Sequence, residues 1–138
     1  MIDRRDLMVG NWVKIPQKII RVSNVVSNGV ISDTTIYQEE RIDPIPVTVE
    51  MLKKIGFEEH KGICPKTFYR YWDKEYRYKL DVDPDFCNSD RKFSIHIDNG
   101  DCETIGSGEF TYVHELQNLT RIITGFSLPI TKEMVEDV

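Results

Sequence analysis

The chain carries scattered side chains of the types that bind soft metal ions or act as nucleophiles. They are two histidines and all three cysteines: His60, Cys64, Cys87, His96 and Cys102. Zinc sites use thiolates and imidazoles in closely spaced pairs such as Cys-x-x-Cys. No such pair occurs here, and the order of these residues does not single out a Cys–His nucleophile pair. The sequence therefore predicts no metal site and no catalytic cysteine.

An acidic run, Asp81-x-Asp83-x-Asp85, has the spacing that opens a calcium-binding loop. In such a loop the sixth position is a glycine that the turn requires, and the twelfth is a bidentate glutamate. These positions hold Phe86 and Lys92, so a solvated acidic turn is the better interpretation. Because no nucleophile, metal or phosphate motif is present, we expect no catalytic residue, no cofactor and no enzyme activity.

Aromatic and cationic residues gather in one segment, residues 66–82. Six of the fourteen aromatic residues and five lysines or arginines lie in it. The alternation predicts a β-hairpin with a two-residue turn at Asp73-Lys74. The tyrosines that then face the core are Tyr69 and Tyr71 on the first strand, paired with Tyr78 and Tyr76 on the second.

The other face of this hairpin is the best candidate for a binding surface. Its members are aromatic or cationic: Phe68, Arg70, Trp72, Arg77 and Lys79. A three-residue loop at 73–75 would bury Phe68 and Trp72 but draw Arg70 into the core. Burying an unpaired guanidinium is costly, so we expect the two-residue turn.

Two interpretations of this face remain open. Proteins that bind single-stranded nucleic acid combine stacking aromatics with a cationic groove, as this face does. Alternatively, Arg70 or Arg77 stacks on Trp72 and another part of the chain covers the face, which is the commoner arrangement in small domains. The net charge of −5 argues against general duplex binding.

A second candidate is a polar stripe at helical spacing near the C-terminus, made by His114, Gln117, Asn118 and Arg121. Such a stripe is able to grip a partner or a phosphate. More often it is the solvated side of an amphipathic helix, which is what we expect here. We also expect His96 and Glu103 to pair across a hairpin.

The elements that must position these residues follow from turn and cap signals. Residues 6–47 are rich in β-formers, with an Asn28-Gly29 hairpin signal, and they resemble the start of an SH3-like barrel. A short helix is expected at about 48–56, with Thr48 as N-cap and Gly56 in the left-handed position after it.

The last third of the chain predicts a second hairpin and a long helix. The strand of Phe93, Ile95 and Ile97 should turn at Asn99-Gly100 into residues 102–105, with Cys102 facing inward opposite Ile97. Residues 106–108, Gly-Ser-Gly, are expected to form a loop. The helix should run over about 111–124 and end at Gly125. Its apolar stripe is Tyr112, Leu116, Leu119 and Ile123, widened by Val113 and Ile122.

Length and composition suit one α+β domain of 138 residues, with a β-rich part at 1–47 and an α+β part at 48–138. The apolar runs are too short for a membrane helix. The first residues lack the apolar core of a signal peptide, and an odd number of cysteines suits a reducing compartment. We therefore expect a cytoplasmic protein that does not associate with membranes.

Three motifs carry a resemblance to a family. They are Leu7-x-x-Gly10-Asn11-Trp12-Val13, then Ile45-Pro46-Val47-Thr48-x-Glu50-x-Leu52-x-x-x-Gly56-Phe57, and finally Tyr112-Val113-His114-Glu115-Leu116-Gln117-Asn118-Leu119 with Ile123-Thr124-Gly125. In this order they resemble small uncharacterised proteins of anaerobic gut bacteria, their prophages and other mobile elements. Glu115 stands where that family has glutamine, and Phe126-Ser127 replaces an acidic pair. The resemblance implies a phage-related origin and brings no activity with it.

The function that these observations favour is that of a non-catalytic accessory protein that binds a protein partner. Its contact surface would be the aromatic-cationic hairpin face or the polar stripe. The alternative is a module that binds single-stranded nucleic acid through Phe68, Arg70, Trp72, Arg77 and Lys79. The sequence names neither the partner nor the oligomeric state.

Overall fold

The computed structural model describes residues 2–62, 67–75, 77–84 and 93–136. The strands are β1 (Trp12–Ile15), β2 (Lys18–Arg21), β3 (Asn24–Val26), β4 (Gly29–Ser32), β5 (Thr35–Gln38), β6 (Glu58–Lys61), β7 (Thr67–Trp72), β8 (Tyr78–Pro84), β9 (Phe93–Asn99) and β10 (Thr104–Phe110). The helices are α1 (Val49–Ile55), α2 (Val113–Thr124) and α3 (Lys132–Val135), with single 3-10 turns at Arg4–Asp6 and Glu39–Arg41. The paired strands are antiparallel, so the predicted β-rich α+β fold is confirmed.

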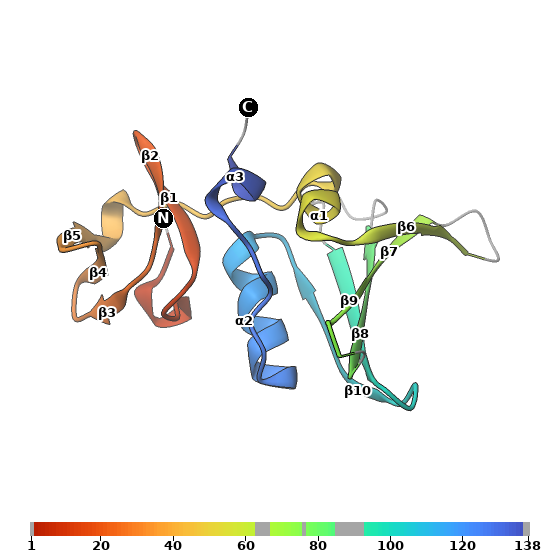
Figure 1. Cartoon of the computed structure of the whole chain (residues 1–138). Coiled ribbons are helices and arrows are strands. Elements are labelled where there is room, and N and C mark those ends of the chain that lie inside the picture. Colours follow the sequence, from red (N-terminus) through yellow and green to blue (C-terminus); the bar gives the residue numbers. More distant parts are fainter. Residues whose placement is uncertain (1, 63–66, 76, 85–92, 137–138) are drawn as a thin grey trace.

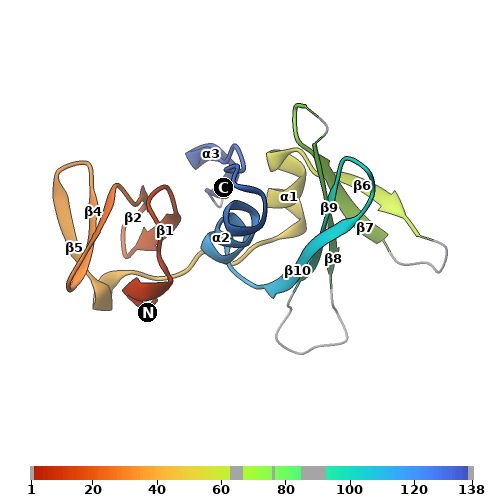
Figure 2. The same ribbon diagram turned by 90° about the horizontal axis from the view of Figure 1, so that it is seen from below.

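The molecule has two β parts with helices between them (Figure 1). The N-terminal part contains the β1–β2 hairpin and the three-stranded sheet β3–β4–β5, and the other part is a five-stranded sheet in the order β10-β9-β8-β7-β6. Seen from below, α2 and α1 separate the two parts (Figure 2). No helix of the described residues is long and apolar enough to cross a membrane.

The N-terminal strands enclose a small apolar cluster of their own. Its buried members are Ile2, Leu7, Val13, Ile20, Val22, Val30 and Ile42. The predicted hairpin after Val26 is present, with Val26 paired to Gly29. A Cβ at Gly29 would lie 2.0 Å from the backbone oxygen of Tyr37, so only glycine allows β5 to approach β4 here. The β-rich N-terminal part is therefore confirmed.

Local cap signals place α1 where the sequence predicts it. The Thr48 side chain accepts a hydrogen bond of 3.2 Å from the backbone N–H of Met51. After the helix, Gly56 has a φ of 122°, and the N–H of Phe57 reaches back to the carbonyl of Leu52 at 2.9 Å. The helix buries Met51, Leu52 and Ile55, which joins it to the core of the five-stranded sheet.

The faces of the 66–82 hairpin are as predicted, but its turn is longer. Tyr71 pairs with Leu80 and Tyr69 with Val82, not with Tyr76 and Tyr78. Tyr69, Leu80 and Val82 are buried, which confirms the core face and contradicts the three-residue loop. Tyr76 lies outside the described residues.

A buried aspartate explains the longer turn. Only 6% of Asp73 is exposed. Its carboxylate accepts a hydrogen bond of 2.9 Å from the backbone N–H of Tyr78, and its own N–H donates to the carbonyl of Tyr78. Asp73 and Tyr78 therefore close a loop where we expected a two-residue turn at Asp73-Lys74.

Two predictions for the second hairpin are wrong. Gly106 and Gly108 lie inside β10 and pair with Ile97 and Ile95, so residues 106–108 are strand and not loop. Cys102 is exposed in the turn at a φ of 63°, and it does not face Ile97. The reason for the glycines is the helix above them, because a Cβ at Gly106 would lie 2.7 Å from the Ile123 side chain.

The C-terminal helix α2 ends as predicted, at Gly125 with a φ of 82°. Leu116 is fully buried, whereas Ile122 is 73% exposed, so the predicted widening of the apolar stripe at Ile122 is wrong. The short helix α3 was not predicted from the sequence. The segment leading to it packs against the protein through Leu128 and Ile130, and Val135 of α3 is buried as well.

Candidate functional site

The outer face of the five-stranded sheet is the face that points away from α1 and α2 (Figure 2). The buried residues of the sheet point the other way, toward the helices. Strand pairing places Trp72 opposite Lys79, and Lys79 opposite Asp98. In the next row Arg70 lies opposite Asp81, and Asp81 opposite His96. The strands thus bring the predicted aromatic and cationic side chains together with acidic ones.

Arg70 forms a two-pronged ion pair with Asp81. Its Nε lies 2.7 Å from Oδ1, and its Nη2 lies 3.1 Å from Oδ2. Both side chains are largely buried, at 27% and 20% exposure. The hydrogen bond to Asp81 raises the pKa of Arg70 above its ordinary value. Such a fork holds both side chains in one geometry.

Lys79 extends this network to the neighbouring strand. Its Nζ lies 3.1 Å from Asp98 and 3.8 Å from Asp81. The side chains of Lys79 and Asp98 are each 15% exposed. The cations of the outer face are therefore neutralised by carboxylates, a pairing that we did not predict from the sequence. Asp81 lies two residues after Lys79 on β8, so alternation along the strand already puts both side chains on the same face.

The two arginines that we expected over Trp72 lie over other rings. Arg70 lies over the ring of Phe68, at 5.1 Å from the centroid, and His60 stacks on the same ring at 5.4 Å. Arg77 lies near the ring of Tyr78 instead. Trp72 remains 38% exposed at the end of β7. The described parts of the chain therefore leave part of this indole in contact with solvent.

Arg77 belongs to the loop at the edge of the face. Its Nε lies 3.0 Å from Glu75 and 3.4 Å from Asp73. Its side chain is 59% exposed. Of the five residues predicted for this surface, Phe68, Arg70, Trp72 and Lys79 share one face of the sheet, and Arg77 lies at its rim.

The polar stripe of α2 makes an interface with the N-terminal β part, although Arg121 is exposed. Gln117 accepts a hydrogen bond of 2.9 Å from the backbone N–H of Trp12 and donates one of 3.1 Å to the carbonyl of Gly10. Arg121 Nη1 donates to the carbonyl of Val9 at 2.9 Å. These bonds join α2 to the start of the N-terminal β part, so the expected solvated face is wrong for Gln117.

Asn118 and the buried Asn11 continue the same interface. Asn11 Nδ2 donates to Asn118 Oδ1 at 2.8 Å, and Asn118 Nδ2 donates to the carbonyl of Asp6 at 2.9 Å. Asn11 Oδ1 accepts from the N–H of Met8 at 2.8 Å. The polar residues of the motifs around Asn11 and Asn118 therefore have a structural task, which is to satisfy each other and the adjacent backbone.

His114 is buried at the same interface, with 5% exposure. Its Nδ1 has no hydrogen-bond partner among the described residues. Burial lowers the pKa of His114, and the nearby charges of Glu115 and Asp6 oppose this change only in part. The neutral imidazole is therefore the favoured form, and the predicted solvated position is wrong.

The other candidate ligands do not come together. His60 lies on β6 and His96 on β9, with two strands between them, and Cys102 lies in the turn after β9. Cys64 and Cys87 lie outside the described residues. Within the described part of the chain, no group of three His, Cys, Asp or Glu side chains is placed to hold a metal ion.

Two further sequence predictions concern residues of this sheet. The acidic turn was predicted for Asp81, Asp83 and Asp85, but Asp81 and Asp83 lie within β8, and Asp85 lies outside the described residues. His96 pairs with Ser107 and Asp81, and not with Glu103 as we expected. The turn is longer than we expected, because Asp98 pairs with Thr104 and the N–H of Asn99 donates to the carbonyl of Glu103. The bulge between Thr104 and Gly106 then shifts the register further.

Comparisons with known proteins do not assign the chain to a family. No family model, no curated protein and no solved structure matches the chain. The resemblance to proteins of gut bacteria and their mobile elements therefore stays an expectation. The candidate site rests on the geometry of the outer face alone.

Proposed function

We propose that the protein is a non-catalytic accessory protein, and that it binds a protein partner through the outer face of its five-stranded sheet. The observation that carries this proposal is the position of Trp72. It is 38% exposed on a sheet face that no described helix covers, beside the ion-paired Arg70 and Lys79. Tryptophan and arginine are the side chains that most often dominate binding energy at protein interfaces.

The ion pairs give this surface two properties that suit a protein partner. They fix Arg70 and Lys79 before any partner arrives, so less side-chain freedom is lost on binding. They also place one cation next to one anion in each row of the face, Lys79 beside Asp98 and Arg70 beside Asp81. A partner with its own mixture of charges fits such a pattern and is oriented by it.

Single-stranded nucleic acid is the second candidate, and the same ion pairs count against it. Binding to a phosphate backbone gains its energy from cations that are available to phosphates. On this face Arg70 is engaged by Asp81, and Lys79 by Asp98. The aromatic residues of the face are suited to stacking on nucleic-acid bases. The cations beside them, however, are already paired with carboxylates and so are less available to phosphates.

The remaining parts of the proposal come from the sequence. A cytoplasmic location follows from cysteine usage, and an origin in a prophage or other mobile element follows from the family resemblance. In such a setting, a small protein without an active site acts by occupying or bridging the surfaces of other proteins.

A capture experiment with two matched variants tests the proposal. Trp72→Ala removes the exposed indole, and Ile122→Ala removes an apolar side chain that is 73% exposed on α2, away from the outer face. We expect Trp72→Ala to lose the partners captured from a host extract and Ile122→Ala to retain them. Both variants should keep their free energy of unfolding within about 1 kcal/mol, because both sites are exposed.

Two results would overturn the proposal. One is capture of the same partners by wild type and Trp72→Ala, and the other is a large loss of stability in Trp72→Ala, which would make the indole part of the core. A titration with short fluorescent single strands at low salt addresses the alternative. Saturable binding that weakens with added salt would favour the nucleic-acid function instead.

A further inference from the structure

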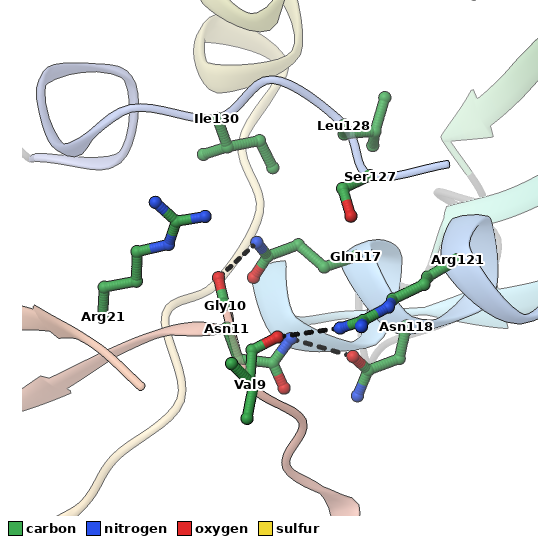
Figure 3. Close-up of a pocket in the computed structure, with 10 residues that line it drawn as sticks. All are labelled: Val9, Gly10, Asn11, Arg21, Gln117, Asn118, Arg121, Ser127, Leu128 and Ile130. Atoms are coloured by element: carbon green, nitrogen blue, oxygen red, sulfur yellow. Dashed lines mark hydrogen bonds between the residues drawn. The ribbon is translucent and has the colours of Figure 1, made fainter. Parts of the chain in front are cut away.

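A pocket of about 240 Å³ lies where α2, the start of the N-terminal β part and the segment before α3 meet (Figure 3). It is separate from the outer face of the sheet. Arg21 at the end of β2 and Arg121 of α2 both line it, together with Gln117 and Ser127. Leu128 and Ile130 contribute an apolar wall. Two parts of the chain that are distant in the sequence, within residues 9–21 and 117–130, therefore build one hollow.

The charge of this pocket is unlike that of the rest of the molecule. The protein has a net charge of −5, but none of the described residues that line the pocket is acidic. On the outer face, in contrast, Arg70 and Lys79 have carboxylate partners. Among the described residues, no ion pair involves either Arg21 or Arg121. The pocket thus holds two positive charges without a counter-charge.

Both guanidinium groups are held in place by contacts that leave donors available. Arg121 uses Nη1 to reach the carbonyl of Val9, at 2.9 Å. Arg21 lies against the ring of Trp12, at 5.9 Å from the centroid. A guanidinium has five N–H donors, so each keeps several for a ligand. Figure 3 shows the two groups on opposite sides of the Gln117 side chain, with the Ser127 hydroxyl nearby.

We propose that this pocket binds a phosphate group, either as inorganic phosphate or as the phosphate of a small molecule. A phosphate carries a charge of about −1.5 to −2 at neutral pH, which matches two arginines. Arginine forks bind phosphate oxygens in pairs. The volume is below the roughly 300–1,000 Å³ of pockets for drug-sized ligands, which favours a small anion over a nucleotide. This site is independent of the proposed protein partner.

The test uses the intact protein and the side-chain Nε–Hε NMR signals of Arg21 and Arg121. Inorganic phosphate and phenyl phosphate are titrated separately, with benzoate as a carboxylate comparison. We expect saturable shifts of both signals with phosphate. Tighter binding of phenyl phosphate would show that Leu128 and Ile130 contact an organic carrier, and equal binding would identify inorganic phosphate as the ligand. Benzoate should bind more weakly than phenyl phosphate, because it carries less charge.

Three variants decide whether the pocket is responsible. Arg21→Gln and Arg121→Gln should each weaken phosphate binding about tenfold or more, as the loss of a charge-assisted hydrogen bond predicts. Arg41→Gln changes an exposed arginine of the 3-10 turn at Glu39–Arg41 that does not line the pocket, and it should bind as the wild type does. If Arg21→Gln lowers the melting temperature, Arg21→Lys replaces it in the binding experiment. Lysine keeps the positive charge but lacks the paired N–H donors of the guanidinium, so weaker phosphate binding is again expected.

Thermal unfolding gives an independent readout, because a ligand that joins three segments stabilises the folded state. Phosphate also stabilises proteins without binding a site, so the informative quantity is the difference between variants. Phosphate should raise the melting temperature of Arg41→Gln more than that of Arg21→Gln. The proposal is overturned if wild-type signals show no saturation up to about 20 mM phosphate, or if all three variants lose affinity equally.

Discussion

The side chain of Gln117 takes the place of a neighbouring strand for the backbone of Trp12. Its Oε1 accepts the N–H of Trp12 at 2.9 Å, and its Nε2 donates to the carbonyl of Gly10 at 3.1 Å. The two residues are 105 positions apart in the chain. A single amide on α2 therefore satisfies a donor and an acceptor of the N-terminal β part, and it ties the two ends of the fold together.

Replacing Gln117 should weaken the whole fold. Gln117→Ala leaves the Trp12 N–H and the Gly10 carbonyl without these partners, which costs about 1–3 kcal/mol of unfolding free energy. Urea unfolding followed by far-UV circular dichroism measures the change. Gln38→Ala is the matched control, because Gln38 is exposed and its side chain makes no cap hydrogen bond. Equal stabilities of the two variants would contradict the interface role of Gln117.

The glycines of β10 should be intolerant of a methyl group. A Cβ at Gly106 meets Ile123 at 2.7 Å, and one at Gly108 meets Leu119 at 3.1 Å. Gly106→Ala should therefore cost about 1–3 kcal/mol through overpacking. The double variant Gly106→Ala with Ile123→Ala should recover part of this loss, so that the two changes are not additive.

Ser107 provides the control for the glycine experiment. It lies between the two glycines on the same strand, and its side chain is on the exposed face. Ser107→Ala should change the unfolding free energy by less than about 0.5 kcal/mol. If Gly106→Ala is as mild as Ser107→Ala, then α2 does not rest on the strand as closely as the structure places it.

His114 should make the fold sensitive to mild acid. Burial lowers its pKa below the ordinary value of 6.5, so the unfolded chain binds the proton more readily than the folded one. The stability is complete above pH 6.5 and falls as the pH drops below this value toward the lower pKa of the folded state. Urea midpoints at pH 7.5, 6.5 and 5.5 should decrease in that order.

A substitution separates this effect from general acid denaturation. His114→Gln removes the titrating group, and the loss of stability between pH 6.5 and 5.5 should become smaller. His96→Gln, which replaces an exposed histidine of β9, is the matched control. Identical pH dependence in wild type and His114→Gln would show that other groups cause the acid sensitivity.

Elements that depend on neighbouring residues were predictable from the sequence. Thr48, Gly56 and Gly125 act at the ends of their helices as expected, because caps are closed by hydrogen bonds across three to five residues. The two faces of the 66–82 hairpin were also predictable, since alternation along a strand places Tyr69 inward and Trp72 outward. The turn length was not, because it depends on the burial of Asp73.

The candidate sites were predictable only in part. The residue types of the outer face were recognised, but their ion pairs with Asp81 and Asp98 appear only when β8 and β9 are in register. The stripe on α2 has the same spacing whether it faces water or another part of the chain. Arg21 was not singled out, because nothing near it in the sequence indicates that it lines a pocket together with Arg121.

The sequence by itself determined the β-rich N-terminal part, the short helix with its caps, the inward and outward faces of the strands and the end of α2. These features are local, because they depend on hydrogen bonds between residues a few positions apart or on the alternation of side chains along one strand. Only the tertiary structure decided that Gln117 faces Trp12, that residues 106–108 form a strand beneath α2, and that two arginines share one pocket. Each of these depends on how separate elements pack against one another. The same residue types fit either a solvated surface or an interface until packing selects one.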